Sequence, residues 1–228
     1  MNRHIYRLVA AVLAAITIVS CNDARKSETF RVLEDVDSYI EARPDSALAV
    51  LEGIDVEDLG SREEKAKYAL LMSMALDKNY IDRTDFEVLQ PAIDYYESHG
   101  SATDKLRTFY YQGRIYYNRG EAEETMECLI KSIDLGFESN DLKTKARNYT
   151  VQGTLYFLYY NWDKIIESGL AAADCYKALE DWDNYVVILC RISEGYSMKG
   201  DKEQASEYLS KCQDLLDKIN SNSKAYYY

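Results

Sequence analysis

The segment FYYQGRIY at residues 109–116 decides the fold, because two related segments follow it at a constant interval of 40 residues. They are YTVQGTLY at 149–156 and LCRISEGY at 189–196. In each segment a large apolar residue, a small residue four positions later and a Tyr three positions after that lie on one face of a helix. The small residues are Gly113, Gly153 and Ser193, and they predict that a partner helix approaches closely at these points.

Each segment is followed by a helix stop and then by a second helix. The stops NRGE (118–121) and KGD (199–201) contain Gly, which accommodates the left-handed backbone that ends many helices, whereas Tyr160-Asn161 replaces the Gly in the middle copy. The second helices repeat a largely small-large-small pattern at offsets of four and three, with departures at Ile165 and Gly169. Its positions are Thr125, Leu129 and Ser132, then Ile165, Gly169 and Ala172, then Ala205, Leu209 and Cys212.

This order of residues resembles the tetratricopeptide repeat, lengthened from about 34 residues to 40. Three copies carry the resemblance, although Ser193 replaces the usual Gly and the terminal Pro is absent. The resemblance implies an all-α fold, a right-handed α-solenoid of antiparallel helical hairpins. The composition favours helix as well, because the chain has only two Pro and 10 Gly in 228 residues.

Counting outward from the three copies predicts a helical array over residues 28–220. Its five hairpins are expected at about 28–54, 61–99, 103–136, 142–179 and 182–219. The second hairpin is degenerate, as is common near the end of a solenoid, and its second helix is expected around 86–98. Arg43-Pro44 predicts a helix stop followed by Pro in a new first turn. Residues 221–228 resemble the start of a further repeat, so we expect a fragment or a truncated family member.

The N-terminus has the features of a lipoprotein signal peptide over residues 1–20. Two Arg precede an apolar run over 8–19, which is shorter than the roughly 20 apolar residues of a permanent transmembrane helix. The sequence IVSC at 18–21 resembles the bacterial lipobox, in which the cysteine thiol receives diacylglycerol. We therefore expect a lipid on Cys21, a tether over 21–27 and a place in the cell envelope, at the periplasmic face of a membrane or at the cell surface. The alternatives are an ordinary signal peptide with an incidental Cys and a cytosolic apolar helix.

Three further segments resemble tetratricopeptide lipoproteins of the Bacteroidales. They are RPDSAL (43–48), DKNYID (77–82) and IDYY (93–96). Larger members of that group follow the repeats with a membrane helix and a cytoplasmic output segment, such as a helix-turn-helix, and resemble transmembrane regulators. The resemblance implies that this chain is an envelope scaffold or the sensor part of such a regulator.

Charge and motifs argue against several function classes. The formal net charge of −12 disfavours nucleic acid, because phosphate backbones repel so acidic a chain. No GxSxG, Walker A, HExxH or CxxC motif occurs, so we expect no catalysis, cofactor or metal site. His99 is interpreted as favourable charge at a helix C-terminus. Four cysteines are interpreted as buried free thiols, namely Cys128, Cys175, Cys190 and Cys212. A Cys190–Cys212 disulfide is the alternative, and the spacing of the cysteines does not decide between the two.

The candidate binding surface is the concave face that the first helix of each stacked hairpin would line. Arg beside Tyr suits an extended peptide or an acidic chain end, because Arg pairs with carboxylate and Tyr offers rigid apolar area. We therefore predict a protein or peptide partner, with a glycan or nutrient ligand as the alternative. The Tyr could instead be core and the Arg simply solvated. With Arg114 and Tyr117 foremost, the positions that match the family pattern are Arg107, Tyr110, Arg114, Tyr117, Asn118, Arg147, Thr150, Thr154 and Phe157.

Overall fold

The structure, a computed structural model, describes residues 27–219. This part of the chain has ten α-helices, two short 3-10 helices and no strand, so the predicted all-α class is confirmed. The predicted signal peptide, the lipidated Cys21, most of the tether and the start of a further repeat lie outside the described residues. None of the helices in 27–219 is both long and apolar enough to cross a membrane.

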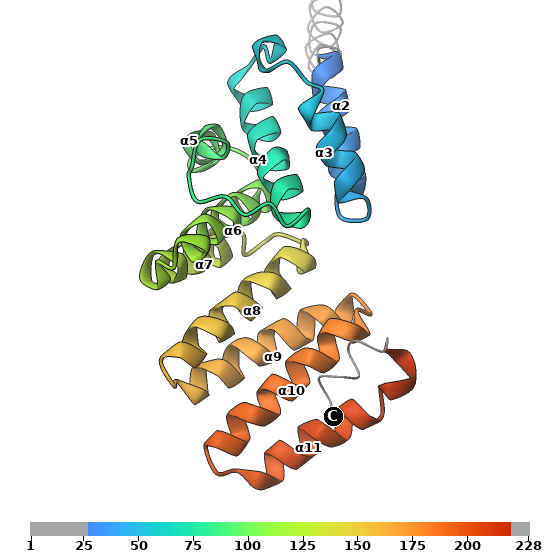
Figure 1. Ribbon diagram of the computed structural model, residues 1–228, viewed down its shortest axis with the longest axis vertical. Coiled ribbons are helices and arrows are strands. Elements are labelled where there is room, and N and C mark those ends of the chain that lie inside the picture. The colour runs from blue at the N-terminus through green and yellow to red at the C-terminus, as the bar shows by residue number, and fades with distance from the viewer. Residues whose placement is uncertain (1–26, 220–228) are drawn as a thin grey trace, which may run out of the picture.

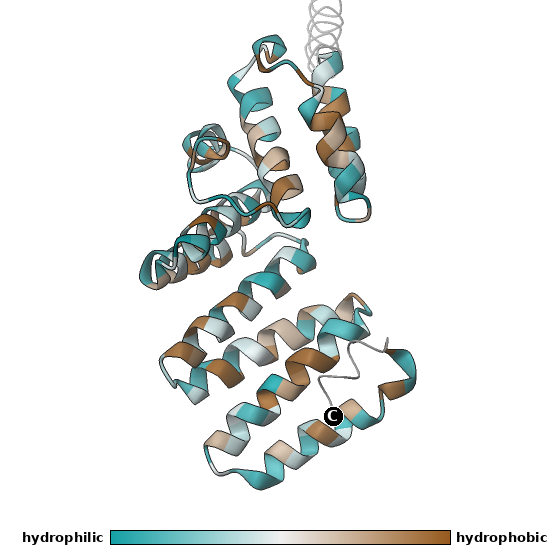
Figure 2. Ribbon diagram, viewed as in Figure 1, coloured by the Kyte–Doolittle hydropathy of each residue, from teal (hydrophilic) through white to brown (hydrophobic). Residues whose placement is uncertain are grey.

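The helices follow one another along an extended array (Figure 1). From α6 onward each helix reverses direction and packs most extensively on its neighbour in sequence. Apolar and polar residues alternate along the helices, so each helix has a side that its neighbours can cover (Figure 2). The α-helices are α2 (Glu28–Tyr39), α3 (Pro44–Glu52), α4 (Arg62–Lys78), α5 (Gln90–Tyr96), α6 (Ala102–Arg119), α7 (Ala122–Leu135), α8 (Leu142–Leu158), α9 (Trp162–Ala178), α10 (Trp182–Met198) and α11 (Lys202–Gln213), and the 3-10 helices are η1 (Val56–Asp58) and η2 (Leu216–Lys218).

The starts of the later helices recur at a regular interval. The helices α6, α8 and α10 begin 40 residues apart, and so do α7, α9 and α11. Five of these six starts share one capping arrangement, in which a short polar side chain accepts a hydrogen bond from the backbone N–H three residues on. The capping residues are Ser101, Asp141, Asn161, Asp181 and Asp201.

The turns between paired helices need a left-handed residue. Gly120 has φ 78° and Gly200 has φ 83°, as the predicted Gly stops require. The equivalent position between α8 and α9 is Tyr160, with φ 55°, and Tyr80 after α4 has φ 60°. A left-handed Tyr is unfavourable by itself, so the packing of the flanking helices must hold these two turns in place.

Small residues set how closely the paired helices approach, as their positions in the sequence predict. A Cβ atom at Gly113 would lie 3.3 Å from side-chain atoms of Cys128 and Leu129. Ser193, at the equivalent position of α10, uses its hydroxyl to donate to the Ala205 carbonyl oxygen of α11 at 2.8 Å. Gly169, which departs from the small-large-small pattern, has a similar role, because a Cβ atom there would lie 2.7 Å from Ile192 of α10.

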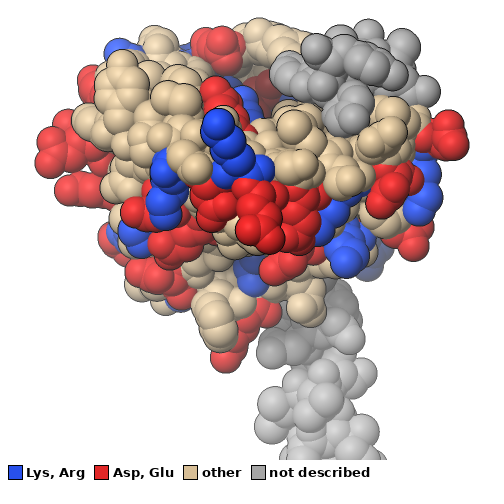
Figure 3. All heavy atoms as spheres, turned by 90° about the horizontal axis from the view of Figure 1, so that it is seen from below, with Lys and Arg blue, Asp and Glu red and all other residues tan. Residues whose placement is uncertain are grey.

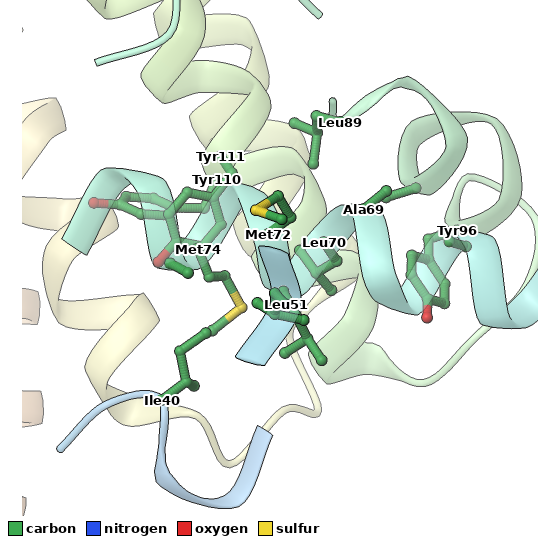
Figure 4. Close-up of a cluster of buried hydrophobic side chains, with 14 of the residues drawn as sticks. Ile40, Leu51, Ala69, Leu70, Met72, Met74, Leu89, Tyr96, Tyr110 and Tyr111 are labelled. Carbon is green, nitrogen blue, oxygen red and sulfur yellow. The ribbon is translucent and has the colours of Figure 1, made fainter. Parts of the chain in front are cut away.

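The hydrophobic core is shared between neighbouring hairpins. Side chains of α3, α4, α5 and α6 converge in one cluster, among them the fully buried Leu51 and Met74 and the nearly buried Tyr110 (Figure 4). A second cluster joins α8, α9, α10 and α11 around Leu189 and Ile192. Since each hairpin covers the apolar face of the next, no hairpin buries its apolar surface by itself.

Two local features compare directly with the sequence-based expectations. Pro44 is the first residue of α3, as predicted. The helix expected around 86–98 is shorter, and α5 spans only Gln90–Tyr96 with Pro91 in its first turn. Because Pro has no backbone N–H and fits only the first turn of a helix, Pro91 limits how far α5 can extend toward residue 86.

Replacing Leu129 with Ala should destabilise the array, because this fully buried side chain fills the space opposite Gly113. We expect a loss of about 2–5 kcal/mol in the free energy of unfolding, measured by chemical denaturation. The neighbouring Ile130 is 46% exposed, so Ile130→Ala is the matched control and should cost less than about 1 kcal/mol. Equal losses in the two variants would contradict this packing.

Candidate functional site

A cavity of about 650 Å³ lies between α8 and α10, with side chains of α9 and α11 completing its wall. We call it the α8–α10 groove. Apolar, polar and charged side chains all contribute to it. The lining residues are Tyr149, Thr150, Gly153, Thr154, Phe157 and Leu158 of α8, Ile165 and Gly169 of α9, Val187, Ile188, Cys190, Arg191, Ser193, Glu194 and Ser197 of α10, and Leu209 of α11.

The α8 wall comes from residues about one turn apart. Thr150, Thr154 and Phe157 follow at offsets of four and three, which places them on one face of the helix. The Thr150 hydroxyl donates to the Ala146 carbonyl oxygen at 2.8 Å, and the Thr154 hydroxyl donates to the Thr150 carbonyl oxygen at 3.1 Å. Because both hydroxyl protons are used within α8, these hydroxyls can only accept further hydrogen bonds. Phe157 is 44% exposed and meets the ring of Trp162 edge-on, so it offers apolar area at the rim.

The α10 wall supplies the charged groups. Arg191 Nη1 donates to Thr154 Oγ1 at 2.9 Å and so links the two walls. Within residues 27–219 no carboxylate forms an ion pair with Arg191. Glu194 lies three residues further along the same exposed side of α10. The exposed guanidinium of Arg191 therefore keeps donors for a ligand carboxylate, with one negative charge close by.

The predicted groove arginines of α6 and α8 are held inside the array instead. Arg147 Nη1 and Nη2 donate to the two carboxylate oxygens of Glu41 at 3.0 and 2.9 Å. Arg107 Nη1 donates to Asp37 at 2.7 Å, while its Nε donates to Asp141. These arginines are only partly exposed, and each is paired with a carboxylate of its own chain.

Four other predicted groove residues also make internal contacts. Arg114 Nε donates to Asp77 at 2.9 Å, and its guanidinium lies 5.2 Å from the ring centre of Tyr117, which is 37% exposed. Asn118 Nδ2 donates to the carbonyl oxygen of Arg83 at 3.1 Å. Tyr110 is only 4% exposed and belongs to the core, as the alternative interpretation of the Tyr residues has it. The structure thus divides the predicted surface: Thr150, Thr154 and Phe157 line the α8–α10 groove, and the other six residues do not.

Glu41 is the centre of the ion pairs that occupy this inner surface. It follows α2 and also accepts from Lys78 Nζ of α4 at 2.6 Å, so Glu41, Lys78 and Arg147 form what we call the Glu41 cluster. Burial would raise the pKa of Glu41, but the hydrogen bonds and charges of Arg147 and Lys78 outweigh it and lower the pKa from 4.5 to about 2. Burial and the charge of Arg147 lower the pKa of Lys78 despite its contact with Glu41. Arg147 is therefore the cation that chiefly stabilises the carboxylate.

The repeat interval could have identified the α10 wall from the sequence. Adding 40 to Thr150, Thr154 and Phe157 leads to three positions that line the groove, Cys190, Glu194 and Ser197. The residues predicted for the binding surface come only from α6 and α8, and none was predicted from the third copy of the repeat, which forms α10. Arg191 was missed for another reason: its equivalents are Tyr111 and Val151, which carry no signal for a charged ligand.

The described residues offer little for metal chemistry. No group of three or more His, Cys, Asp or Glu in 27–219 could hold a metal ion. His99 lies three residues beyond the last residue of α5, and its ring stacks on Tyr95 with 4.6 Å between ring centres. The groups at the α8–α10 groove, with Phe157 at the rim and Arg191 on the α10 wall, suit binding of an apolar group and a carboxylate together.

Comparison with known proteins adds no family or relative. No family model matches the sequence, and no curated protein matches it.

Replacing Glu41 with Gln should weaken folding in a pH-dependent way. The pKa of Glu41 is lowered in the folded chain, so its contribution is fully present above about pH 4.5 and is lost as the pH falls toward 2. At pH 7 we expect Glu41→Gln to lower the free energy of unfolding by on the order of 2 kcal/mol in urea denaturation.

The difference between wild type and this variant should shrink as the pH is lowered from about 5 to about 2.5. Asp35→Asn is the matched control, because Asp35 is an exposed carboxylate of α2, and it should change stability little. A Glu41→Gln difference that stays constant over this pH range would contradict the ion-pair assignment.

Proposed function

We propose that the chain is a lipid-anchored scaffold or sensor module of the bacterial cell envelope that binds a peptide segment of a partner protein in the α8–α10 groove. The observation that carries the proposal is the groove itself, in which the unpaired guanidinium of Arg191 stands beside apolar side chains. The proposal includes no catalytic step.

The repeat type is part of the proposal. A right-handed, tetratricopeptide-like α-solenoid with a period of 40 residues is supported by the equal spacing of the helix starts from α6 to α11. The close approach at Gly113, Gly153 and Ser193 supports it too, since all three occupy the same position of the repeat. In such a solenoid the first helices of the hairpins, here α8 and α10, line the concave face.

The ligand chemistry follows from the two walls of the groove. Phe157, Ile188 and Leu209 offer apolar area for an aliphatic or aromatic side chain, while Arg191 suits a carboxylate one or two residues away. A nucleic acid is not proposed. Seen from below, acidic side chains gather near the middle of the face in Figure 3, with basic ones around them, and the formal net charge of −12 disfavours a polyanion.

The anchor and the location rest on the sequence. The lipobox-like IVSC segment supports lipidation of Cys21, and the described array begins only a few residues later, at Glu28. A short tether of this kind would keep the array close to a membrane surface. The proposal covers either membrane of the envelope.

A library of phage-displayed random peptides tests the groove. Wild-type protein should retain peptides that share an apolar residue near a carboxylate, and Arg191→Glu should lose at least tenfold in affinity for them by calorimetry, because it places a negative charge opposite the ligand carboxylate. Arg31→Glu is the matched control, since it makes the same charge change on an exposed residue of α2, and it should bind like wild type.

Equal binding by the two charge variants would contradict the groove, as would the absence of any enriched peptide. Saturable heat from a panel of glycans, with none from the peptides, would favour the glycan-binding alternative instead.

Lipidation is tested by expression in a bacterium that processes lipoproteins. Wild-type protein should partition into the detergent phase on cloud-point extraction, because acyl chains on Cys21 bury in micelles, whereas Cys21→Ser should stay in the aqueous phase. Cys128→Ser is the matched control, because Cys128 is a buried thiol of α7, and it should partition like wild type. Detergent-phase recovery of Cys21→Ser would contradict the anchor.

A further inference from the structure

Two cysteines of the last hairpin lie in contact. Cys190 of α10 and Cys212 of α11 place their Sγ atoms 3.7 Å apart. The two helices pack on each other along their length, so the contact joins consecutive helices across 22 residues of sequence. Cys212 is fully buried, whereas Cys190 is half-buried and lines the α8–α10 groove.

We propose that Cys190 and Cys212 are a dithiol pair that oxidises to a disulfide and so links α10 to α11. The sulfur atoms are close enough that side-chain rotation can bring them to the bonding distance of about 2.05 Å. The proposal is independent of what the groove binds, since it rests on the contact between the two thiols.

The surroundings of the two thiols assign their roles. Contact with Cys212 lowers the pKa of the Cys190 thiol, while contact with Cys190 and burial raise the pKa of Cys212, whose Sγ also lies 3.9 Å from the Val186 carbonyl oxygen. Cys190 is also the thiol that a reagent can reach through the groove. Cys190 is therefore the attacking thiolate and Cys212 the resolving thiol.

The reaction needs a disulfide-bearing oxidant, either a small-molecule disulfide or the disulfide of an oxidoreductase. The Cys190 thiolate attacks one sulfur of the oxidant, breaks its S–S bond and releases one thiolate, which leaves a mixed disulfide on Cys190. Cys212 then attacks Cys190 Sγ and breaks the mixed disulfide, and its proton passes to the departing sulfur, which leaves as the second thiol of the oxidant. Two protein thiols are oxidised and one external disulfide is reduced to two thiols.

The other two cysteines of the described chain differ from this pair. Burial raises the pKa of Cys128 to about 11 and also raises the pKa of Cys175. Within residues 27–219 neither of them has a second thiol in contact. Oxidation should therefore select Cys190 and Cys212.

Incubation of the reduced protein with oxidised glutathione, followed by alkylation and peptide mass spectrometry, tests the pair. Cys190 and Cys212 should lose alkylation together and be recovered as one cross-linked peptide pair, while Cys128 and Cys175 remain alkylated. Cys212→Ser should stop at a glutathione adduct on Cys190, whereas Cys190→Ser should yield no adduct on Cys212. The oxidised wild type should melt several degrees above the reduced form, and the double Ser variant should show no such shift.

A result in which all four thiols alkylate fully after oxidation would overturn the proposal. So would a cross-link that joins Cys190 or Cys212 to a different cysteine. A glutathione adduct on Cys212 in Cys190→Ser would reverse the assigned roles.

Discussion

The carboxylate of Glu41 joins parts of the chain that are far apart in sequence, and it ties the first hairpin to α4 and α8. Arg147 of α8 reaches Glu41 across 106 residues, and Lys78 of α4 meets the same carboxylate. Asp37, one turn earlier, receives Arg107 of α6. These ion pairs hold the first hairpin against three later helices, so the arginines that would otherwise face a ligand are neutralised by the protein's own acids.

The two ends of the array therefore differ in how their charged side chains are paired. Between α2 and α8 the ion pairs of Asp37 and Glu41 link the first hairpin to α4, α6 and α8. In the described part of the chain no ion pair joins α8 to α10, and Arg191 in the α8–α10 groove is hydrogen-bonded to Thr154.

Local structure could be predicted well from the sequence, because its causes are local. The Gly stops at Gly120 and Gly200 and the Pro in the first turn of α3 each act within a few residues of their own position. Gly113 acts on Cys128 and Leu129 of the partner helix, but the 40-residue repeat marks its position in the sequence. The expected helix around 86–98 was too long, because Pro91 fits only the first turn of a helix and α5 begins at Gln90. Tyr160 takes a left-handed conformation that no propensity would assign to it, because the flanking helices impose the turn.

The candidate site could be predicted only in part, for a physical reason. Thr150, Thr154 and Phe157 line the groove because their helical face is set by spacing alone. Whether Arg107 and Arg147 face a ligand depends on where Asp37 and Glu41 arrive in space, and their separations of 70 and 106 residues leave no periodic trace in the sequence. Cys190 and Cys212 show the same limit, since spacing left their pairing open and only the packing of α10 on α11 brings their sulfur atoms together.

Site-specific photo-crosslinking in the cell tests most directly whether the partner binds between α8 and α10. A benzophenone amino acid is placed at Thr154, in the groove, or at Tyr117, an exposed position of α6 outside the groove. A discrete partner adduct from position 154 that is absent from position 117 is the predicted result. Adducts from position 117 with none from position 154 would contradict binding in the groove and would indicate that the partner binds near the arginines of α6.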